Sequence, residues 1–501
     1  MSDLRTVLRD LGGIFMMIGM ISLFVLVVPI YFGEFGSNSS VDGIIPILVT
    51  SIMFVGFGLP LYFGFRNADP ANFKTAMVTA ALGWLFVSII GSIPFILMPY
   101  NINTLVNMDF LSAFFESMSG WSGTGLTMVA NEELLPHTLQ FWRTWIQWVG
   151  SVGVIVLTLS ILARPGTGSF VLYKGEARDK KTHPSIVSTV RTIWWIFLLY
   201  TIIGIVALTI IGVIFSSGMD GWQSLNHAMT GLATGGFSVT DDSLASFGVI
   251  SQITVLILMI FGSVAFAAHY DLLKGRFKKF LSDAQLKAMI ALIILGVIGL
   301  TLLNLPESGQ NFLFSLKRSG FQFISALTCT GFASEDLAGW TEQAKLILSF
   351  AMIIGGAAGS TAGGIKLYRG ILLYNGVSWR IKRAISTPRR VFVHKLGEKP
   401  LSKDDAMDLI NEAAIISFMW VILLFAGVVI VMQTTGANLS NSMFEVCSAQ
   451  GNVGLSTGIT NIGMEPIPKT MLIINMWVGR LEIIPIIVLI RSMLGIKRNI
   501  I

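Results

Sequence analysis

Residues 116–127 read ESMSGWSGTGLT, and three later stretches of the chain repeat the same pattern. The repeats are HAMTGLATGGFS at 227–238, QFISALTCTGFA at 322–333 and EVCSAQGNVGLS at 445–456. Aligned without gaps, each stretch ends in a glycine, then leucine or phenylalanine, then a small residue. The aligned glycines are Gly125, Gly236, Gly331 and Gly454. A pattern that recurs in register indicates a repeated structural unit.

A second glycine follows each of these four at a nearly constant distance. Gly150, Gly262, Gly355 and Gly479 lie 25, 26, 24 and 25 residues further along the chain. A short amphipathic stretch of about ten residues precedes each first glycine, too short to cross a bilayer, which takes about 20 residues. The expected unit is therefore a helix, a short re-entrant helix, an extended loop and a second helix. Because all four units enter from the same side, the repeat is parallel rather than inverted.

The composition is that of a membrane protein. Hydrophobic residues make up 53% of the chain and charged residues 12%, whereas a soluble domain is about 25% charged. Windows of roughly 20 apolar residues recur along the whole length, as in transmembrane helices. The expected spans are 12–33, 43–65, 75–98, 139–163, 190–215, 247–271, 283–304, 340–375, 407–433 and 469–493. We therefore expect an all-α polytopic membrane protein of about ten transmembrane helices, with four parallel helix–pore loop–helix repeats around a pseudo-fourfold pore.

The apolar windows and the repeats also set the expected segment boundaries. An N-terminal two-helix hairpin covers 1–67, and the repeats cover 68–165, 186–276, 281–376 and 403–496, the third with a broken second helix. Two basic loops, at 166–185 and 377–402, are expected to be cytoplasmic.

The charges are distributed by side of the membrane. Most of the 34 Lys and Arg residues fall in segments on one side of the spans, and the opposite segments hold only Lys317 and Arg318. By the positive-inside rule, both termini are cytoplasmic and the chain is a multi-pass protein of the cell (inner) membrane. The net charge of +6 therefore reports topology and not nucleic-acid binding. The outer segments carry acidic residues, which raise the local cation concentration.

The loops that end in the four aligned glycines are the predicted selectivity filter. Non-helical backbone at membrane depth is tolerated only where it lines a wet path or is buried in protein. Glycine adopts positive φ without steric cost, and four such loops around one axis form a ring of carbonyl oxygens that replaces a cation's hydration shell. One such glycine alone would more simply be a loop turn. The predicted filter consists of Ser122, Gly123, Thr124 and Gly125; Ala233, Thr234, Gly235 and Gly236; Thr328, Cys329, Thr330 and Gly331; and Gly451, Asn452, Val453 and Gly454.

Residues 353–366, IIGGAAGSTAGGIK, place a run of glycines inside an apolar segment. Each glycine disfavours a helix interior by about 1 kcal/mol relative to alanine. A small-residue packing face would explain Gly359 and Gly363, but not the adjacent glycine pairs or the excess length of the segment. We expect a broken helix whose middle is a flexible gate. The predicted gate consists of Gly355, Gly356, Gly359, Ser360, Thr361, Gly363, Gly364 and Arg480.

Arg480 occupies the repeat position of Gly356 and is an intramembrane cation below the predicted filter. Two interpretations are open: a structural partner of Glu482 or of loop carbonyls, or a positive barrier in the ion path. Matching positions behind the filter hold Glu116, His227, Gln322 and Glu445, which are expected to brace the loops. Arg143 is expected to brace the outer end of its helix, without chemistry of its own. We find no catalytic constellation at helix depth, so we do not expect an enzyme.

These segments resemble a known family. FESMSGWSGTGLT, GGAAGSTAGGIK, QGNVGLS and NMWVGRLEI are similar to the pore and gate segments of the Trk/Ktr/HKT superfamily of potassium transporters. The additional N-terminal hairpin favours the TrkH-type membrane subunit. The resemblance implies a selective pore in each subunit, with K+ held at the filter carbonyls, and the broken third-repeat helix as its gate. It also implies a homodimer and a cytoplasmic nucleotide-binding regulatory ring, TrkA-like, so that no cofactor is bound by this chain itself.

The expected function is potassium uptake through a gated, channel-like pore across the cell membrane, with membrane lipid as surroundings and no nucleic-acid partner. A K+ symporter driven by Na+ or H+ is the alternative within transport, and it would need a buried carboxylate on the ion path. The only candidates are Glu116, Glu445 and Glu482. A non-conducting regulatory or scaffold subunit is a further alternative, against which the four intact filter loops argue.

Overall fold

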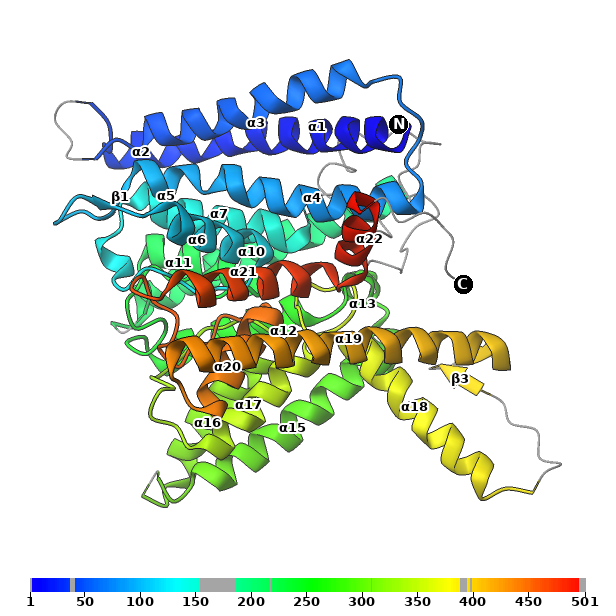
Figure 1. Ribbon diagram of the computed structural model, residues 1–501. Coiled ribbons are helices and arrows are strands. Elements are labelled where there is room, and N and C mark those ends of the chain that lie inside the picture. Colours follow the sequence, from blue (N-terminus) through cyan, green and yellow to red (C-terminus); the bar gives the residue numbers. More distant parts are fainter. Residues whose placement is uncertain are drawn as a thin grey trace.

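The computed structural model describes residues 2–36, 41–153, 186–216, 218–307, 309–387, 394–396 and 399–494. Within these ranges the chain is mostly helical (Figure 1), as predicted. The strands form two short antiparallel pairs, β1 (Pro99–Asn101) with β2 (Val106–Asn107) and β3 (His394–Leu396) with β4 (Lys399–Leu401).

The N-terminal helices form a hairpin at the edge of the molecule (Figure 1). Helix α1 (Ser2–Ser22) continues through a 3-10 turn (Leu23–Leu26) into α2 (Val27–Phe32), and α3 (Ile44–Gly64) runs back beside it. Glycine allows the two backbones to approach closely, since a Cβ at Gly58 would lie 2.7 Å from the backbone nitrogen of Met16. Small residues at such crossings are the usual basis of helix packing in membranes.

Four units with the same arrangement of helices follow the hairpin. Each has a long helix of 19 to 33 residues, then a short helix that leads into a predicted filter loop, and then a third helix of 13 to 16 residues. The units are α4 (Phe73–Gly91), α6 (Phe110–Ser122) and α7 (His137–Val152); α10 (Ile186–Ile214), α11 (Gly221–Leu232) and α12 (Val249–Ser263); α15 (Ala284–Asn304), α16 (Phe312–Leu327) and α17 (Glu342–Ile354); and α19 (Lys403–Thr435), α20 (Leu439–Gln450) and α21 (Pro466–Leu481). A short helix α5 (Ile93–Leu97) and a 3-10 turn (Glu132–Leu134) also belong to the first unit.

The short helices α6, α11, α16 and α20 all begin with the same type of cap. The capping side chains are Asp109, Asp220, Asn311 and Asn438, and each accepts a hydrogen bond from the backbone N–H three residues later. Such caps satisfy donors that a helix leaves free at its start. The short helices contain 13, 12, 16 and 12 residues, slightly more than predicted.

The third helix of every unit ends within two residues of its landmark glycine. The last helical residues are Val152, Ser263, Ile354 and Leu481. Helix α12 meets α13 (Phe266–Leu273) at 107°, and α21 meets α22 (Ile484–Met493) at 110°. The prediction of continuous spans at 247–271 and 469–493 was therefore wrong. The fourth-unit bend is made by backbone at positive φ, since Glu482 and Ile483 have φ of 61° and 69°.

The third unit is also divided. Helix α17 ends at Ile354, residues 355–366 form a loop, and α18 (Leu367–Ala384) projects from the body (Figure 1). In the described part of the chain, six helices are long and apolar enough to span a membrane, or up to eight if each bent pair is one span. The count differs from about ten because 340–375 is divided and because 139–163 runs into residues 154–163, which lie outside the described ranges.

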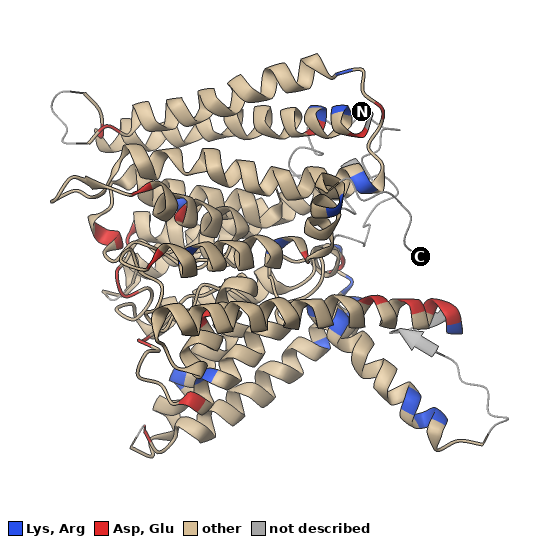
Figure 2. Ribbon diagram, viewed as in Figure 1, with Lys and Arg blue, Asp and Glu red and all other residues tan. Residues whose placement is uncertain are grey.

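Figure 2 shows that the charged residues lie mostly toward the two ends of the helices. Most described Lys and Arg residues lie at the end that carries α18, where α1 begins and α22 lies (Figures 1 and 2). The predicted basic loop at 166–185 lies outside the described residues, and α18 forms the first part of the other one, at 377–402. A further short helix, α14 (Phe277–Ser282), joins the second and third units at this end.

Candidate ion pathway

The four aligned glycines lie in a closed ring of backbone contacts. A Cβ added at Gly125 would collide with the carbonyl oxygen of Gly235, which immediately precedes the glycine of the second unit. The same relation continues around the ring: Gly236 faces the Thr330 carbonyl, Gly331 faces the Val453 carbonyl, and Gly454 faces the Thr124 carbonyl. Each unit thus contacts the next through equivalent atoms, and the fourth contacts the first. Only glycine fits at these positions without displacing a neighbouring backbone.

The four loops share one backbone conformation. The filter glycines have φ of 91°, 75°, 89° and 105°. The residues two positions earlier also have positive φ; they are Gly123, Thr234, Cys329 and Asn452. In each loop the N–H of the residue before the filter glycine donates to a carbonyl in the last turn of the short helix. Repetition of both angles in four loops of different sequence shows that the units are structurally equivalent here.

Serine hydroxyls hold three of the four filter glycines from within the short helix. The N–H of Gly125 donates to Ser119 Oγ at 3.0 Å. Ser325 and Ser448 accept in the same way from Gly331 and Gly454, at 3.1 and 2.9 Å. The second unit has threonine at this position, and the Thr230 hydroxyl donates to its own helix instead.

The polar residues behind the filter brace the loops, as predicted. Glu116 accepts hydrogen bonds from the Thr127 hydroxyl at 2.9 Å and from the Met128 N–H at 2.7 Å. Glu445 accepts equivalent bonds from Ser456 and Thr457, and another from Thr460. His227 contacts the Ser238 hydroxyl at 2.9 Å, and Gln322 donates to Ser334 Oγ at 3.4 Å. All four side chains therefore reach two or three residues beyond the filter glycine of their own unit.

Helix α7 connects the first filter loop to the second. Arg143 is buried and donates to Glu116 Oε1 at 2.8 Å and to the Ser238 carbonyl at 2.8 Å. One turn later, Gln147 Nε2 donates to the Gly235 carbonyl at 2.6 Å. From the sequence, Arg143 was expected only to brace the outer end of its own helix, and Gln147 was not identified. Gln147 could have been found by aligning the units at their landmark glycines. It is the one polar residue at a position where the other units have Met259, Met352 and Met476.

A vestibule of about 400 Å³ opens above the ring. All four filter glycines line it, together with the carboxylates of Glu132, Asp241, Asp242, Glu335 and Asp336. Burial raises the pKa of the Glu132 carboxyl to about 7, against the lowering effect of Arg143, whose Nη2 lies 3.8 Å from Glu132 Oε1. Negative side chains around a narrow opening concentrate cations there.

The predicted gate loop crosses the opposite side of the ring and is bonded to the second unit. The Thr361 hydroxyl donates to the Gly262 carbonyl at 2.8 Å and accepts from the Thr234 hydroxyl at 2.9 Å. The Ala357 N–H donates to the Ser263 carbonyl at 3.0 Å. The glycines of the loop allow close approach, since a Cβ at Gly363 would collide with the Gly451 carbonyl of the fourth filter loop.

Arg480 connects the loop to the first unit. Its guanidinium donates to the Thr361 carbonyl at 3.2 Å and to the Gly150 and Ser151 carbonyls at 2.8 Å each. The guanidinium also lies 5.3 Å from the ring centroid of Trp84. The Thr361 contact is with a loop carbonyl, one of the two structural partners considered for Arg480, whereas Gly150 and Ser151 lie in the last turn of α7.

Glu482 bonds to the last residue of the loop and to the first turn of α18. Its carboxylate pairs with Lys366 Nζ at 2.8 Å and with Arg369. These three side chains are 8%, 14% and 16% exposed, so the pairs are largely withdrawn from water. The triad joins the start of α18 to the bend between α21 and α22.

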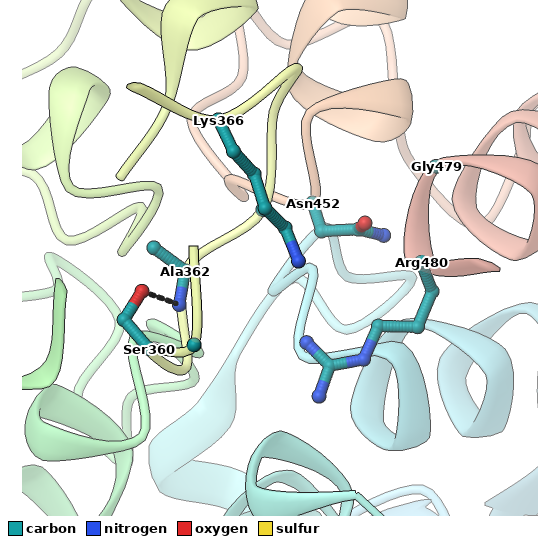
Figure 3. Close-up of a pocket in the computed structure, with 8 residues that line it drawn as sticks. Ser360, Ala362, Lys366, Asn452, Gly479 and Arg480 are labelled. Carbon is teal, nitrogen blue, oxygen red and sulfur yellow. Dashed lines mark hydrogen bonds between the residues drawn. The ribbon is translucent and has the colours of Figure 1, made fainter. Parts of the chain in front are cut away.

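The space between the filter and the loop is nearly filled. A cavity of about 20 Å³ lies here (Figure 3). Its lining residues are Gly359, Ser360, Ala362, Gly363, Lys366, Asn452, Gly479 and Arg480. Figure 3 shows the side chains of Lys366 and Arg480 entering it from the loop and from α21, respectively. Such a volume holds about one water molecule. A hydrated cation does not fit in the cavity as the loop lies here.

The structure therefore brings together all sixteen predicted filter residues in four adjoining loops, and the predicted gate residues directly beneath them. Beyond the prediction, it adds Lys366 to the cavity, the Glu482 triad below it, and Gln147 and Arg143 beside the filter.

A polytopic helical membrane protein with four equivalent pore loops on one ring is the class that the fold and this pathway define. Residues 44–499 match the model of the TrkH family, described as cation transport protein. The chain belongs to the TrkH family, a family of cation transporters and not of enzymes.

The relatives agree with this assignment over most of the chain. An uncharacterised cation transporter of Methanocaldococcus jannaschii is 34% identical, over 98% of this chain and 96% of its own. The Trk system potassium uptake protein TrkH of Escherichia coli K12 is 31% identical, over 83% of this chain and 85% of its own. The crystal structure of the potassium transporter TrkH from Vibrio parahaemolyticus has the same fold, with a TM-score of 0.80, 24% identity, and coverage of 97% of this chain and 98% of that one.

Proposed function

We propose that this protein takes up K+ through a selective, gated, channel-like pore across the cell membrane. The observation that carries the proposal is the closed ring in which each filter glycine faces the preceding carbonyl of the next unit. Four carbonyl-bearing loops around one axis are the arrangement that replaces the hydration shell of K+. Relatives whose names give potassium uptake as their activity share most of the chain.

The buried carboxylates support passive conduction over symport. A coupled carrier usually needs an ionisable group that exchanges protons or ions inside the membrane-spanning part of the path, beyond the outer vestibule. Glu116 and Glu445 are instead saturated by hydrogen bonds from the loops behind the filter. The carboxylate of Glu482 forms ion pairs with Lys366 and Arg369.

We further propose that residues 355–366 and Arg480 form the gate. Contacts of the loop with the second unit, and of Arg480 with the loop and the first unit, support a closed position beneath the filter. Opening would break these hydrogen bonds and widen the small cavity above the loop. The glycines provide the backbone freedom that this movement needs.

The family resemblance and the charge distribution support further proposals about the assembly of the protein and its orientation in the membrane. We propose a homodimer, surrounded by inner-membrane lipid, with both termini in the cytoplasm and K+ as cargo rather than as a resident cofactor. The names of several relatives refer to a Trk system, which supports a multi-component assembly. The proposed cytoplasmic partner is a TrkA-like nucleotide-binding ring that docks on the basic end carrying α18 (Figure 2).

The experiment is 86Rb+ uptake into proteoliposomes that contain the purified protein, with K+ and Na+ as competitors. Uptake without a Na+ or proton gradient, blocked much better by K+ than by Na+ and altered by Gly454→Ser, would support the selective pore. Uptake that required a second ion gradient would support the symporter. If no uptake is seen, shortening the loop within residues 356–363 tests whether a closed gate is the cause, because a non-conducting subunit would stay silent after the change.

A further inference from the structure

Gln147 makes the ring of filter loops unequal. Three positions before the landmark glycine, the second, third and fourth units have Met259, Met352 and Met476, all fully buried. The first unit has Gln147, also fully buried. Methionine has no hydrogen-bond donor, whereas the glutamine amide has both a donor and an acceptor group.

Both groups of the amide contact the second filter loop, on either side of Gly236. Gln147 Nε2 donates to the Gly235 carbonyl at 2.6 Å, and Gln147 Oε1 accepts from the Phe237 N–H at 3.0 Å. The Gly235 oxygen is the atom that faces Gly125 in the ring. A side chain of the first unit therefore fixes a ring carbonyl of the second.

We propose that Gln147 is a positioning residue that sets the cation preference of the filter through its hydrogen bond to the Gly235 carbonyl. The proposal rests on the proposed function. A carbonyl that accepts a strong side-chain hydrogen bond has a fixed orientation and less electron density for an ion. The ring carbonyl of the second loop then differs from the other three in its orientation and in how strongly it attracts a cation. The methionines at the equivalent positions of the other units have no donor for such a hydrogen bond.

The alternative is that Gln147 only fills space between α7 and the second unit. Thr144 on the same helix gives a matched comparison, because its hydroxyl donates to Asn226 Oδ1 at 2.6 Å, on α11 and away from the filter backbone. Thr144→Val removes a buried hydrogen bond between the same two units without touching Gly235.

The test measures 86Rb+ uptake in proteoliposomes and takes the ratio of the Na+ and K+ concentrations that halve it. This ratio does not depend on how much folded protein is present. We expect Gln147→Met to lower the ratio about tenfold, the size that loss of a buried hydrogen bond allows. Gln147→Glu keeps the acceptor for Phe237, and its ionised carboxylate has no donor for Gly235. At a pH high enough to ionise this carboxyl we therefore expect a similar fall. Thr144→Val should keep the wild-type ratio.

A wild-type ratio in Gln147→Met, or in Gln147→Glu alone, would overturn the proposal. If Gln147→Met does not fold, the nearly isosteric Gln147→Glu decides. A wild-type protein that does not discriminate K+ from Na+ would count against the proposed function instead. In that case cryo-EM maps of wild type and Gln147→Glu decide the inference: a displaced Gly235 carbonyl supports it, and an unmoved one overturns it.

Discussion

At the scale of single residues, each filter glycine is required for its backbone angle and for the space beside it. Gly331 has φ of 89° and faces the Val453 carbonyl, so Gly331→Ala adds strain and a collision with backbone. Strained angles of this kind amount to about 1–3 kcal/mol, and 1.4 kcal/mol is tenfold in an equilibrium. We expect Gly331→Ala to reduce the K+ over Na+ preference of 86Rb+ uptake about tenfold or more.

Gly339 supplies the control for this substitution. It lies in the outer loop of the same unit, and nothing within 4 Å would contact an added Cβ. Gly339→Ala should keep the wild-type preference. Equal preferences in the two variants would contradict the role given to the filter glycines.

The glycines were predictable from the sequence, and the atoms that position them were not. Four glycines in register leave a repeat pattern because only glycine fits the ring. The position two residues before each filter glycine also has positive φ, but it leaves no repeat pattern in the sequence. Its four residues have no type in common: they are Gly123, Thr234, Cys329 and Asn452. There the turn is imposed by hydrogen bonds from the end of each short helix. Gln147 differs from the methionines at the aligned positions, but its role was not predicted because its hydrogen-bond partner is in another unit.

At the scale of elements, the broken helices are held together by the buried triad. Glu482 compensates two cations at the start of α18, and removing one member of a buried ion group costs about 3–5 kcal/mol. Glu482→Gln leaves Lys366 and Arg369 facing each other without the anion. We expect a lower melting temperature and several-fold faster 86Rb+ uptake in the absence of any cytoplasmic partner, because the start of α18 is released from the bend after α21.

Glu465 is the matched carboxylate for this experiment. It is exposed and precedes the first residue of α21, so Glu465→Gln makes the same chemical change at the other end of that helix. It should leave both the melting temperature and the uptake unchanged. A Glu482→Gln variant that melts and conducts as wild type does would show that the triad does not hold the loop.

The sequence predicted one broken helix, whereas the structure has a helix end at every landmark glycine. In the third unit the glycine run carries the signal, since it disfavours helix by itself. The bends at Val264 and Glu482 have no such run and depend on distant contacts. The Phe266 N–H, for example, donates to the Gly359 carbonyl of the gate loop at 3.0 Å. Local propensity does not reveal bends of this kind.

At the scale of the whole molecule, loops from all four units build the acidic vestibule over the ring. Glu132 is its titrating member near neutral pH, with a pKa of about 7. The charged groups around it are Arg143 on α7, Glu116 on α6 and Asp241 in the loop after α11. Because burial raises this pKa, Glu132 is protonated below pH 7 and ionised above it. The vestibule is therefore more negative at pH 8 than at pH 6.

We expect 86Rb+ uptake at low K+ concentration to rise between pH 6 and pH 8, with its midpoint near the pKa of about 7. One added charge at roughly 8 Å in water changes the local cation concentration about twofold, and salt should weaken the effect. Glu132→Gln should abolish the rise, whereas Glu133→Gln, at the exposed neighbour that does not line the vestibule, should keep it. A pH dependence that survives in Glu132→Gln would place the titrating group elsewhere. A profile that falls with pH would contradict an attractive vestibule, because ionisation of a carboxyl can only make the mouth of the pore more favourable to cations.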